Sequence, residues 1–193
     1  LVFLGCGLLA WNLISTLLNE GPQIVVEAET NLRNIPMSVS VLSMRMMYRN
    51  VIIFGHNALV VVGMLLLFGH TLTWNVLWLV PGLLALLLLG WLTGVVVGPL
   101  SARFRDIPQV IANVVQVMFF FTPIFWKPEQ IQGRSVIVDA NPFYHAVELI
   151  RAPLMGNAIA PLTWAVVGGM ILTAAVIAVA TLASVRRRIY LWL

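Results

Sequence analysis

The sequence predicts an all-α polytopic membrane protein, built as a bundle of helices that cross a bilayer. Hydrophobic residues make up 61% of the 193 residues and charged residues only 9%, whereas a soluble domain of average composition has about 25% charged residues. Asp, Glu, Lys and Arg are absent from residues 1–19, 50–102, 107–126 and 152–185. A helix needs about 20 consecutive apolar residues to cross a bilayer core. Each stretch is therefore long enough for one span, and the second is long enough for two.

These stretches predict five visible membrane spans within a single transmembrane domain. The spans cover about residues 1–19, 51–69, 76–99, 107–126 and 160–184. A short uncharged turn, residues 69–75, separates the second span from the third. The longer connections are a segment at 20–50 and a segment at 127–159.

Basic residues are distributed unequally between the two sides of this predicted bundle. One side carries eight arginines, which are Arg33, Arg45, Arg49, Arg103, Arg105, Arg186, Arg187 and Arg188. The other side carries only Lys127, Arg134 and Arg151. The positive-inside rule places the richer side, and with it the C-terminus, in the cytoplasm. A cytoplasmic N-terminus would then require one more span before Leu1, so we expect six spans in the native protein.

The longest connection on the cytoplasmic side, residues 20–50, contains signals for a short helix. Gly21-Pro22 ends the first span, and residues 27–34 are polar and helix-forming. Pro36 restarts a helix, since proline is well tolerated in a first helical turn, and the apolar pattern then runs into the second span. A short helix at this position can dock on another protein. The alternative is a solvated connecting loop.

The segment at 127–159 is too polar to span and too apolar for a solvated loop. Asn141-Pro142 has the pattern of an N-cap followed by a first-turn proline, and Gly156-Asn157 closes the helix. About 13 residues reach near 20 Å at 1.5 Å each, which favours a re-entrant or interfacial helix. His145, Glu148 and Arg151 recur at three-residue spacing. We expect this polar strip to face water, with a functional role as the alternative.

Two further motifs concern helix packing and the cytoplasmic surface. Gly90, Gly94 and Gly98 form a small-residue stripe that lets helices approach closely, and Pro99 is expected to end or bend that helix. The turn after the third span holds Arg103, Arg105 and Asp106. We expect this turn to be a topological anchor with a local ion pair, which contributes little stability when exposed.

Aromatic residues crowd the predicted outer end of the fourth span. They are Phe119, Phe120, Phe121, Phe125 and Trp126, with Pro123 among them. One interpretation is an aromatic belt at the membrane interface. The other is a path for sugars, whose apolar ring faces pack against flat aromatic rings. Pro123 should kink or end the helix near Thr122.

The remaining polar residues and motifs limit the chemistry that this chain can perform. His56 and Asn57 lie within the second span and predict hydrogen-bonded packing rather than proton relay, because no span carries a carboxylate. Cys6 excludes an intramolecular disulfide and is expected to be a packed thiol. Metal spacings, hydrolase motifs and a P-loop are absent from the sequence, so energy from ATP would have to come from a partner.

Several of these segments together resemble the membrane subunits of type-2 ABC exporters for bacterial polysaccharides, and the O-antigen (lipopolysaccharide) export permeases most of all. The likeness covers nearly the whole chain in order. Its segments are Ala10–Leu13, Asn31–Pro36, Arg103–Ile107, Phe119–Ile124 and Asn141–Tyr144.

The resemblance implies six spans with cytoplasmic ends in the bacterial inner membrane. It implies a homodimer around a central translocation path, paired with two copies of an ABC subunit that binds ATP and magnesium. It implies an ATPase-coupling helix at Glu27, Glu29, Asn31, Leu32, Arg33 and Asn34. It also implies short outer gate helices within 127–156, where Asn141, Phe143 and Tyr144 would join the aromatic residues of the path.

The function expected from the sequence is that of a permease subunit that exports a lipid-linked polysaccharide, with no cofactor or metal in this chain and no nucleic-acid partner. Another cargo, such as teichoic acid, capsule or a drug, is the first alternative. An intramembrane glycosyl- or acyltransferase is the second, and a structural scaffold is the third.

Overall fold

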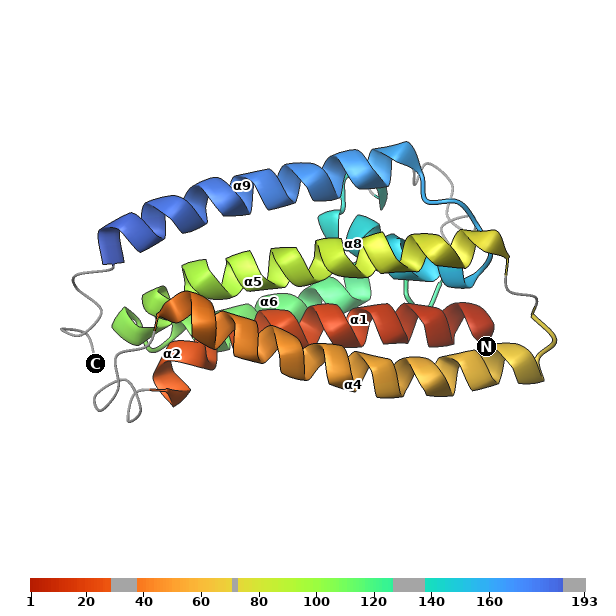
Figure 1. Ribbon diagram of the computed structural model, residues 1–193, viewed down its shortest axis with the longest axis horizontal. Helices are drawn as coiled ribbons and strands as arrows, with labels where there is room; N and C mark the ends of the chain where they lie inside the picture. The colour runs from red at the N-terminus through yellow and green to blue at the C-terminus, as the bar shows by residue number, and fades with distance from the viewer. Residues whose placement is uncertain (29–37, 71–72, 127–137, 186–193) are drawn as a thin grey trace.

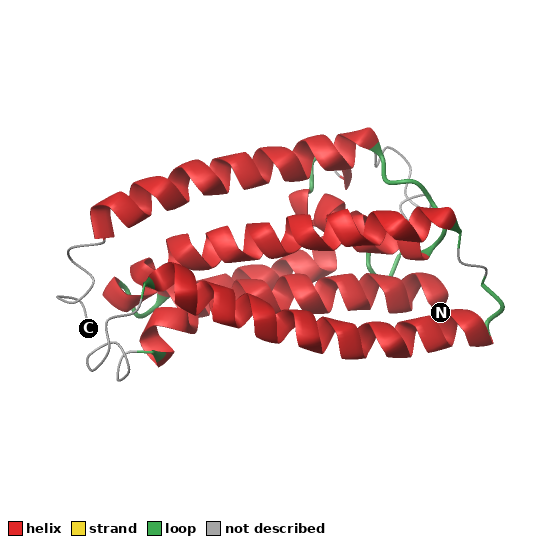
Figure 2. Cartoon of the chain, in the orientation of Figure 1, coloured by secondary structure: helices red, strands yellow, loops and turns green. Residues whose placement is uncertain are grey.

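The computed structural model describes residues 1–28, 38–70, 73–126 and 138–185, and over these ranges it contains helices and turns but no strand. The elements are α1 (Val2–Glu20), η1 (Gly21–Gln23), α2 (Ile24–Glu27), α4 (Val39–Leu67), η2 (Trp74–Trp78), α5 (Leu79–Arg103), α6 (Ile107–Phe121), α8 (Pro142–Leu154) and α9 (Pro161–Val185). Figure 1 shows α1, α4, α5 and α9 running along the long axis, with α2 at one end. Figure 2 shows helices and loops over the described residues. We call the two ends of the bundle the α2 end and the α8 end.

Among the described residues, four helical segments are long and apolar enough to cross a membrane: Val2–Glu27, Val39–Leu67, Trp74–Arg103 and Pro161–Ser184. The predicted fourth span instead forms α6, which has 15 residues and reaches about 22 Å at 1.5 Å per residue. A bilayer core is about 30 Å thick. The number of spans therefore stays a prediction, while the all-helical membrane architecture is clear.

The helix that contains the second span begins earlier than the apolar stretch does. Ser38 is its N-cap and its Oγ accepts from the backbone N–H of Val41, so residues 39–50 belong to the same helix as the apolar residues that follow. At the other end Gly69 has a φ of 66°, and the next amide, that of His70, donates to the Leu65 carbonyl. This left-handed glycine turns the chain towards η2.

Helix α1 lies at the centre of the bundle and contacts α4, α5, α6 and α8. Its buried residues include Cys6, Leu13 and Leu17, which belong to one apolar core shared with the other helices. The prediction that Cys6 is packed inside the protein is confirmed, since its exposed fraction is 0%.

Helix α8 matches its sequence signals closely. Asn141 is the N-cap and accepts from the Phe143 amide, Pro142 is in the first turn, and the chain leaves the helix through Gly156 with a φ of 78°. Nine of its 13 residues are buried, and it packs against α1, α5 and α9. The helix is thus an internal element of the bundle, although it is too short to cross a membrane.

Pro99 does not end its helix, because α5 continues to Arg103; a bend at Pro99, the other expectation, stays a prediction. Two expectations about polar residues are wrong. His56 is exposed, and its Nδ1 lies 2.8 Å from the Ile52 carbonyl of its own helix, so it does not pack inside the bundle. The strip of α8 does not face water, because His145 and Arg151 are each only 1% exposed. Spacing along a helix shows which residues share a face, but not which elements cover that face.

Candidate functional site

Aromatic residues from three helices meet near the α8 end of the bundle. Trp11 of α1 lies 5.5 Å from Phe119 of α6 and 5.9 Å from Phe143 of α8, between ring centroids. Phe119 also contacts Phe120 and Phe125 edge to face, at 5.5 and 5.1 Å. The structure therefore brings together Phe119, Phe125 and Phe143, which sequence analysis had grouped. Trp11 was missed, because it lies far from the aromatic run in the sequence.

The outer members of this aromatic group are open to the surroundings. Phe120, Phe121 and Phe125 are 67%, 65% and 57% exposed, and Trp126 is half-buried. Helix α6 ends at Phe121, and Thr122 adopts an extended conformation with a ψ of 133°. This agrees with the predicted end of the helix near Thr122, because a residue before proline avoids the helical region.

The last two residues of the proposed path lie on α8. Asn141 donates from Nδ2 to the Phe121 carbonyl and to Thr122 Oγ1, both at 3.4 Å. The neighbouring Tyr144 ring lies 5.2 Å from the ring of His145. Asn141 thus connects the end of α6 to the start of α8.

A groove between α1 and α6 continues from the aromatic group along the bundle. Its volume is about 600 Å³, and its lining residues are Leu8, Trp11, Asn12, Ser15, Asn19, Ala112, Val115, Gln116 and Phe119. On α1, Leu8, Asn12, Ser15 and Asn19 recur at spacings of four, three and four residues, and therefore share one face. The groove combines apolar side chains with amide and hydroxyl groups along its length.

Helix α6 has a matching polar stripe, formed by Gln109, Asn113 and Gln116, with Phe120 one turn further on. All four side chains are exposed, and Gln109 Nε2 donates to Asn113 Oδ1 at 3.1 Å. Sequence analysis missed these amides because it searched the spans for charged residues. The spacing of Asn and Gln within the apolar stretches was the signal that could have revealed them.

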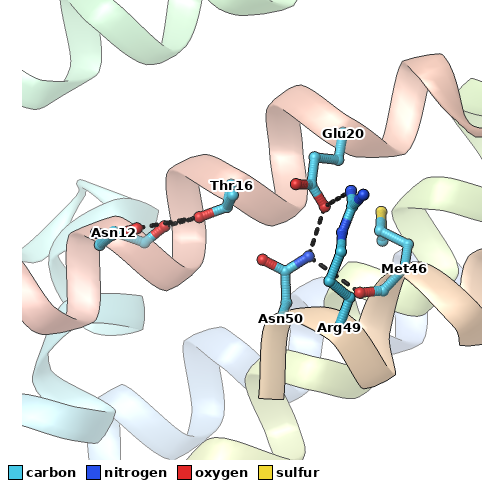
Figure 3. Close-up of polar contacts among 6 residues, drawn as sticks. All are labelled: Asn12, Thr16, Glu20, Met46, Arg49 and Asn50. Carbon is cyan, nitrogen blue, oxygen red and sulfur yellow. Dashed lines mark hydrogen bonds and ion pairs between the residues drawn. The ribbon is translucent and has the colours of Figure 1, made fainter. Parts of the chain in front are cut away.

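A polar cluster closes the opposite, α2 end of α1. Glu20 Oε2 accepts from Asn50 Nδ2 at 2.6 Å and from an Arg49 guanidinium nitrogen at 2.8 Å, as Figure 3 shows. Asn50 also donates to the Met46 carbonyl at 3.0 Å and is 1% exposed. On the preceding turns of α1, Thr16 Oγ1 donates to the Asn12 carbonyl. The cluster joins the end of α1 to α4, the two helices that precede and follow α2 along the chain.

A cavity of about 260 Å³ lies beside this cluster. Its lining includes Glu20, Glu27, Arg45 and Arg49. Glu27, from the predicted coupling set, is exposed at the last position of α2. The other members of that set, Glu29, Asn31, Leu32, Arg33 and Asn34, lie outside the described residues.

The predicted cytoplasmic turn is exposed at the same end of the bundle. Arg103, Arg105 and Asp106 are all exposed, and the Arg103 guanidinium lies 5.3 Å from the centre of the Phe104 ring. Asp106 occupies the N-cap position of α6 without a capping hydrogen bond from its side chain. The turn therefore presents two arginines, an aspartate and an aromatic ring at the surface.

The three glycines of α5 each lie against a different neighbour. A Cβ at Gly90 would meet Leu17 of α1 at 2.8 Å, one at Gly94 would meet Ser43 Oγ of α4 at 2.5 Å, and one at Gly98 would meet Ile24 of α2 at 2.8 Å. Gly82 differs from these three, because its Cβ would lie 2.6 Å from a backbone atom, the carbonyl oxygen of Leu149, and not from a side chain. These close approaches seat α5 against α1, α2, α4 and α8.

Within the described residues, no group of three or more His, Cys, Asp or Glu side chains is arranged to hold a metal ion. The polar groups of the groove are instead amides and hydroxyls, which donate and accept hydrogen bonds without titrating near neutral pH. The site is suited to contact a neutral polar chain.

Comparison with known proteins places this arrangement in a family. The chain is 23% identical over 143 residues to the O-antigen export system permease protein RfbA of Myxococcus xanthus, a match that covers 72% of this chain and 55% of that protein. The chain thus spans about half the length of this relative. The family model of the ABC-2 type transporter matches residues 2–155, a range that contains α1 to α8 and every residue of the groove. The chain belongs to the ABC-2 type transporter family.

Proposed function

We propose that this chain is the membrane-spanning permease subunit of an ATP-driven exporter that moves a lipid-linked, O-antigen-type polysaccharide across the bacterial inner membrane. Membership of the ABC-2 family supports a transport role, and the relative from Myxococcus xanthus, an O-antigen export permease, supports the cargo class. The observation that carries the proposal is the groove of amides and hydroxyls between α1 and α6, which ends at the aromatic group.

The chemistry of this groove suits a sugar polymer. Asn12, Asn19 and Gln116 line the groove and offer amide donors and acceptors, which are complementary to the hydroxyl groups of sugars. The exposed rings of Phe120 and Phe125 offer flat apolar faces on which sugar rings can pack. Since neither group imposes a charge, successive sugars would bind weakly and could slide along the groove.

Exposed amides also argue for a second copy of the chain across this groove. Polar groups within a membrane face a bundle interior or a water-filled cavity rather than lipid. In the proposed homodimer, the amide stripes of two copies enclose the path, and lipid contacts the apolar faces of α9 instead. The proposed orientation, with the C-terminus on the cytoplasmic side, rests on the distribution of arginines between the five predicted spans.

The proposed energy source is a separate ABC subunit, present in two copies, which binds ATP and magnesium. It would dock at the α2 end, on Glu27, Glu29, Asn31, Leu32, Arg33 and Asn34. The cluster of Glu20, Arg49 and Asn50 lies at the base of this connection and binds α1 to α4. A push on the connection would therefore reach both helices together.

The first experiment is affinity purification of the full-length protein in mild detergent, followed by identification of partners and an ATPase assay. A stoichiometric P-loop subunit with ATPase activity is expected. A homogeneous protein with no ATPase partner would overturn the proposal and favour a membrane transferase or a scaffold. If the partner is present, the compound that accumulates in a deletion strain identifies the cargo among O-antigen, teichoic acid, capsule and drugs.

A second experiment tests the path itself. We expect Asn113→Leu combined with Gln116→Leu to reduce export strongly while the protein still reaches the membrane. Val114→Leu is the matched control, because Val114 is 46% exposed on the same helix but lies off the amide stripe. Equal export by both variants would exclude the amide stripe of α6, and with it Gln116 of the groove, as part of the path.

A third experiment tests the proposed coupling. Replacement of Asn31, Leu32 and Arg33 with glycine should uncouple ATP hydrolysis from export, because a flexible segment cannot transmit a push. ATPase activity and export are measured in the same membranes. Unchanged export would show that the coupling set lies elsewhere.

A further inference from the structure

Arg151 is a fully buried cation that contacts three separate parts of the chain. Its Nε donates to Glu148 Oε1 at 2.9 Å, and its Nη1 donates to the Pro123 carbonyl at 2.5 Å. Its guanidinium also lies 4.3 Å from the centre of the Phe3 ring of α1. Burying a charge is costly unless it is paired and hydrogen-bonded, so the surroundings of Arg151 are built to hold it.

The Pro123 carbonyl belongs to the break that follows α6. Thr122 and Ile124, on either side of it, are 1% and 0% exposed. The Ile124 amide donates to the Thr122 carbonyl at 2.7 Å, which makes a tight turn. Asn141 donates to the Phe121 carbonyl just before this turn. Two side chains of the α8 segment therefore bind the backbone at the end of α6, one at each end of α8.

The rest of α6 is much less buried. Among its 15 residues only Val115 is buried, whereas the three residues that follow the helix are all buried. Helix α6 also packs along α1, but the deepest burial of this segment is in the turn at its aromatic end.

We propose that Arg151 is a positioning residue that clamps the aromatic end of α6 to α8, so that Phe119–Phe125 and α8 move as one body. The planar guanidinium can bind the Glu148 carboxylate and the Pro123 carbonyl at the same time. A lysine ammonium is a compact charge without this fork. If Arg151 only balanced the charge of Glu148, lysine would suffice.

The test uses hydrogen exchange of the full chain in lipid nanodiscs, measured by mass spectrometry on peptides that cover 118–125 and, for reference, residues 9–17 of α1. The first variant is Arg151→Lys. The second is Glu148→Gln with Arg151→Met, which removes both charges and leaves no unpaired ion. The third is Asn141→Asp, which keeps an N-cap acceptor for α8 but loses the amide donor to Phe121.

Loss of the clamp should accelerate exchange in 118–125 by about tenfold in both Arg151 variants, with a smaller effect in Asn141→Asp and no change in 9–17. Normal exchange in the doubly neutral variant would reduce Arg151 to a charge-balancing role and overturn the proposal. Acceleration in all peptides together would also overturn it, because it would indicate a general loss of structure. If the Arg151 variants do not accumulate, Asn141→Asp decides, and normal exchange in its 118–125 peptide overturns the clamp.

The link to function rests on the proposed export activity and is measured separately. In the purified complex, Arg151→Lys is expected to lower export while ATP hydrolysis continues, because the aromatic end of the path is misplaced and the α2 end is intact. Hydrogen exchange requires neither cargo nor ATPase. A failure of the export proposal and a failure of the clamp therefore give different results.

Discussion

At the residue scale, partners decide whether a polar side chain stabilises this bundle. Glu20, Arg49 and Asn50 form one cluster, but they differ in burial: the Arg49 side chain is 55% exposed, the Glu20 side chain is 24% exposed, and Asn50 is buried. The ion pair of Arg49 is exposed on one side and contributes little. The hydrogen bond from Asn50 to the carboxylate is part-buried, with a buried donor, and should matter more.

We therefore predict that Glu20→Ala lowers the stability of the protein more than Arg49→Ala does. Removal of the carboxylate leaves a buried amide N–H of Asn50 without its acceptor, which costs about 1–3 kcal/mol. Removal of the arginine costs about 0–1 kcal/mol. Thermal unfolding of both variants in the same detergent provides the measurement. Equal melting temperatures would show that Asn50 finds another partner.

The residues of α8 show which features could be predicted from the sequence and which could not. The caps of α8, at Asn141 and Gly156, are local signals and were read correctly. The burial of Arg151 depends on the Pro123 carbonyl, 28 residues away, and on Phe3 of α1. No local spacing contains those contacts, so the prediction of a water-facing strip was wrong.

At the element scale, close approach of helices depends on what a missing side chain would meet. The rigid backbone carbonyl of Leu149 faces Gly82, whereas the flexible end of the Leu17 side chain faces Gly90. Gly168 of α9 has nothing within 4 Å. Small-residue spacing identified Gly90, Gly94 and Gly98 from the sequence, but Gly82 was missed because it is eight residues from Gly90 and its partner is backbone.

This difference predicts an order of effects for alanine substitutions. Gly82→Ala should destabilise the protein by about 1–3 kcal/mol, since α5 and α8 would have to separate. Gly90→Ala should cost less, because Leu17 can change rotamer. Gly168→Ala is the control and should be neutral. Unfolding by heat in detergent ranks the three, and an equal loss in Gly168→Ala would refute the steric argument.

Helix α6 is shorter than the charge-free stretch that contains it. Charge-free residues 107–126 predicted a full span, yet the helix ends at Phe121. Pro123 accounts for this end, because it forces Thr122 out of the helical region. This end was predicted from Pro123, but the apolar stretch did not reveal that the residues after it form a buried turn.

At the scale of the whole molecule, the surface divides into two kinds. Exposed residues of α9, such as Leu172 and Val176, are apolar and suit contact with lipid. The exposed stripe of α6 carries Gln109, Asn113 and Gln116. An amide transferred to an apolar environment without a hydrogen bond costs about 1–3 kcal/mol by protein mutational data. Several such groups on one face would make contact with lipid costly, which is why we assign this face to a second copy and the path between the copies.

The last prediction tests that assignment in native membranes. With Cys6→Ala as background, Asn113→Cys should form a cross-link between two copies on treatment with a short bifunctional thiol reagent. Leu172→Cys is the matched control, because Leu172 is 70% exposed on α9 and should meet lipid. A cross-linked dimer with Asn113→Cys alone would place the amide stripes of two copies opposite each other. Cross-linking through Leu172→Cys alone would move the contact to α9 and leave the stripe to another partner. Equal cross-linking of both would indicate random collision and contradict a defined dimer, because a fixed interface brings one face of the protein to its copy and keeps the other away.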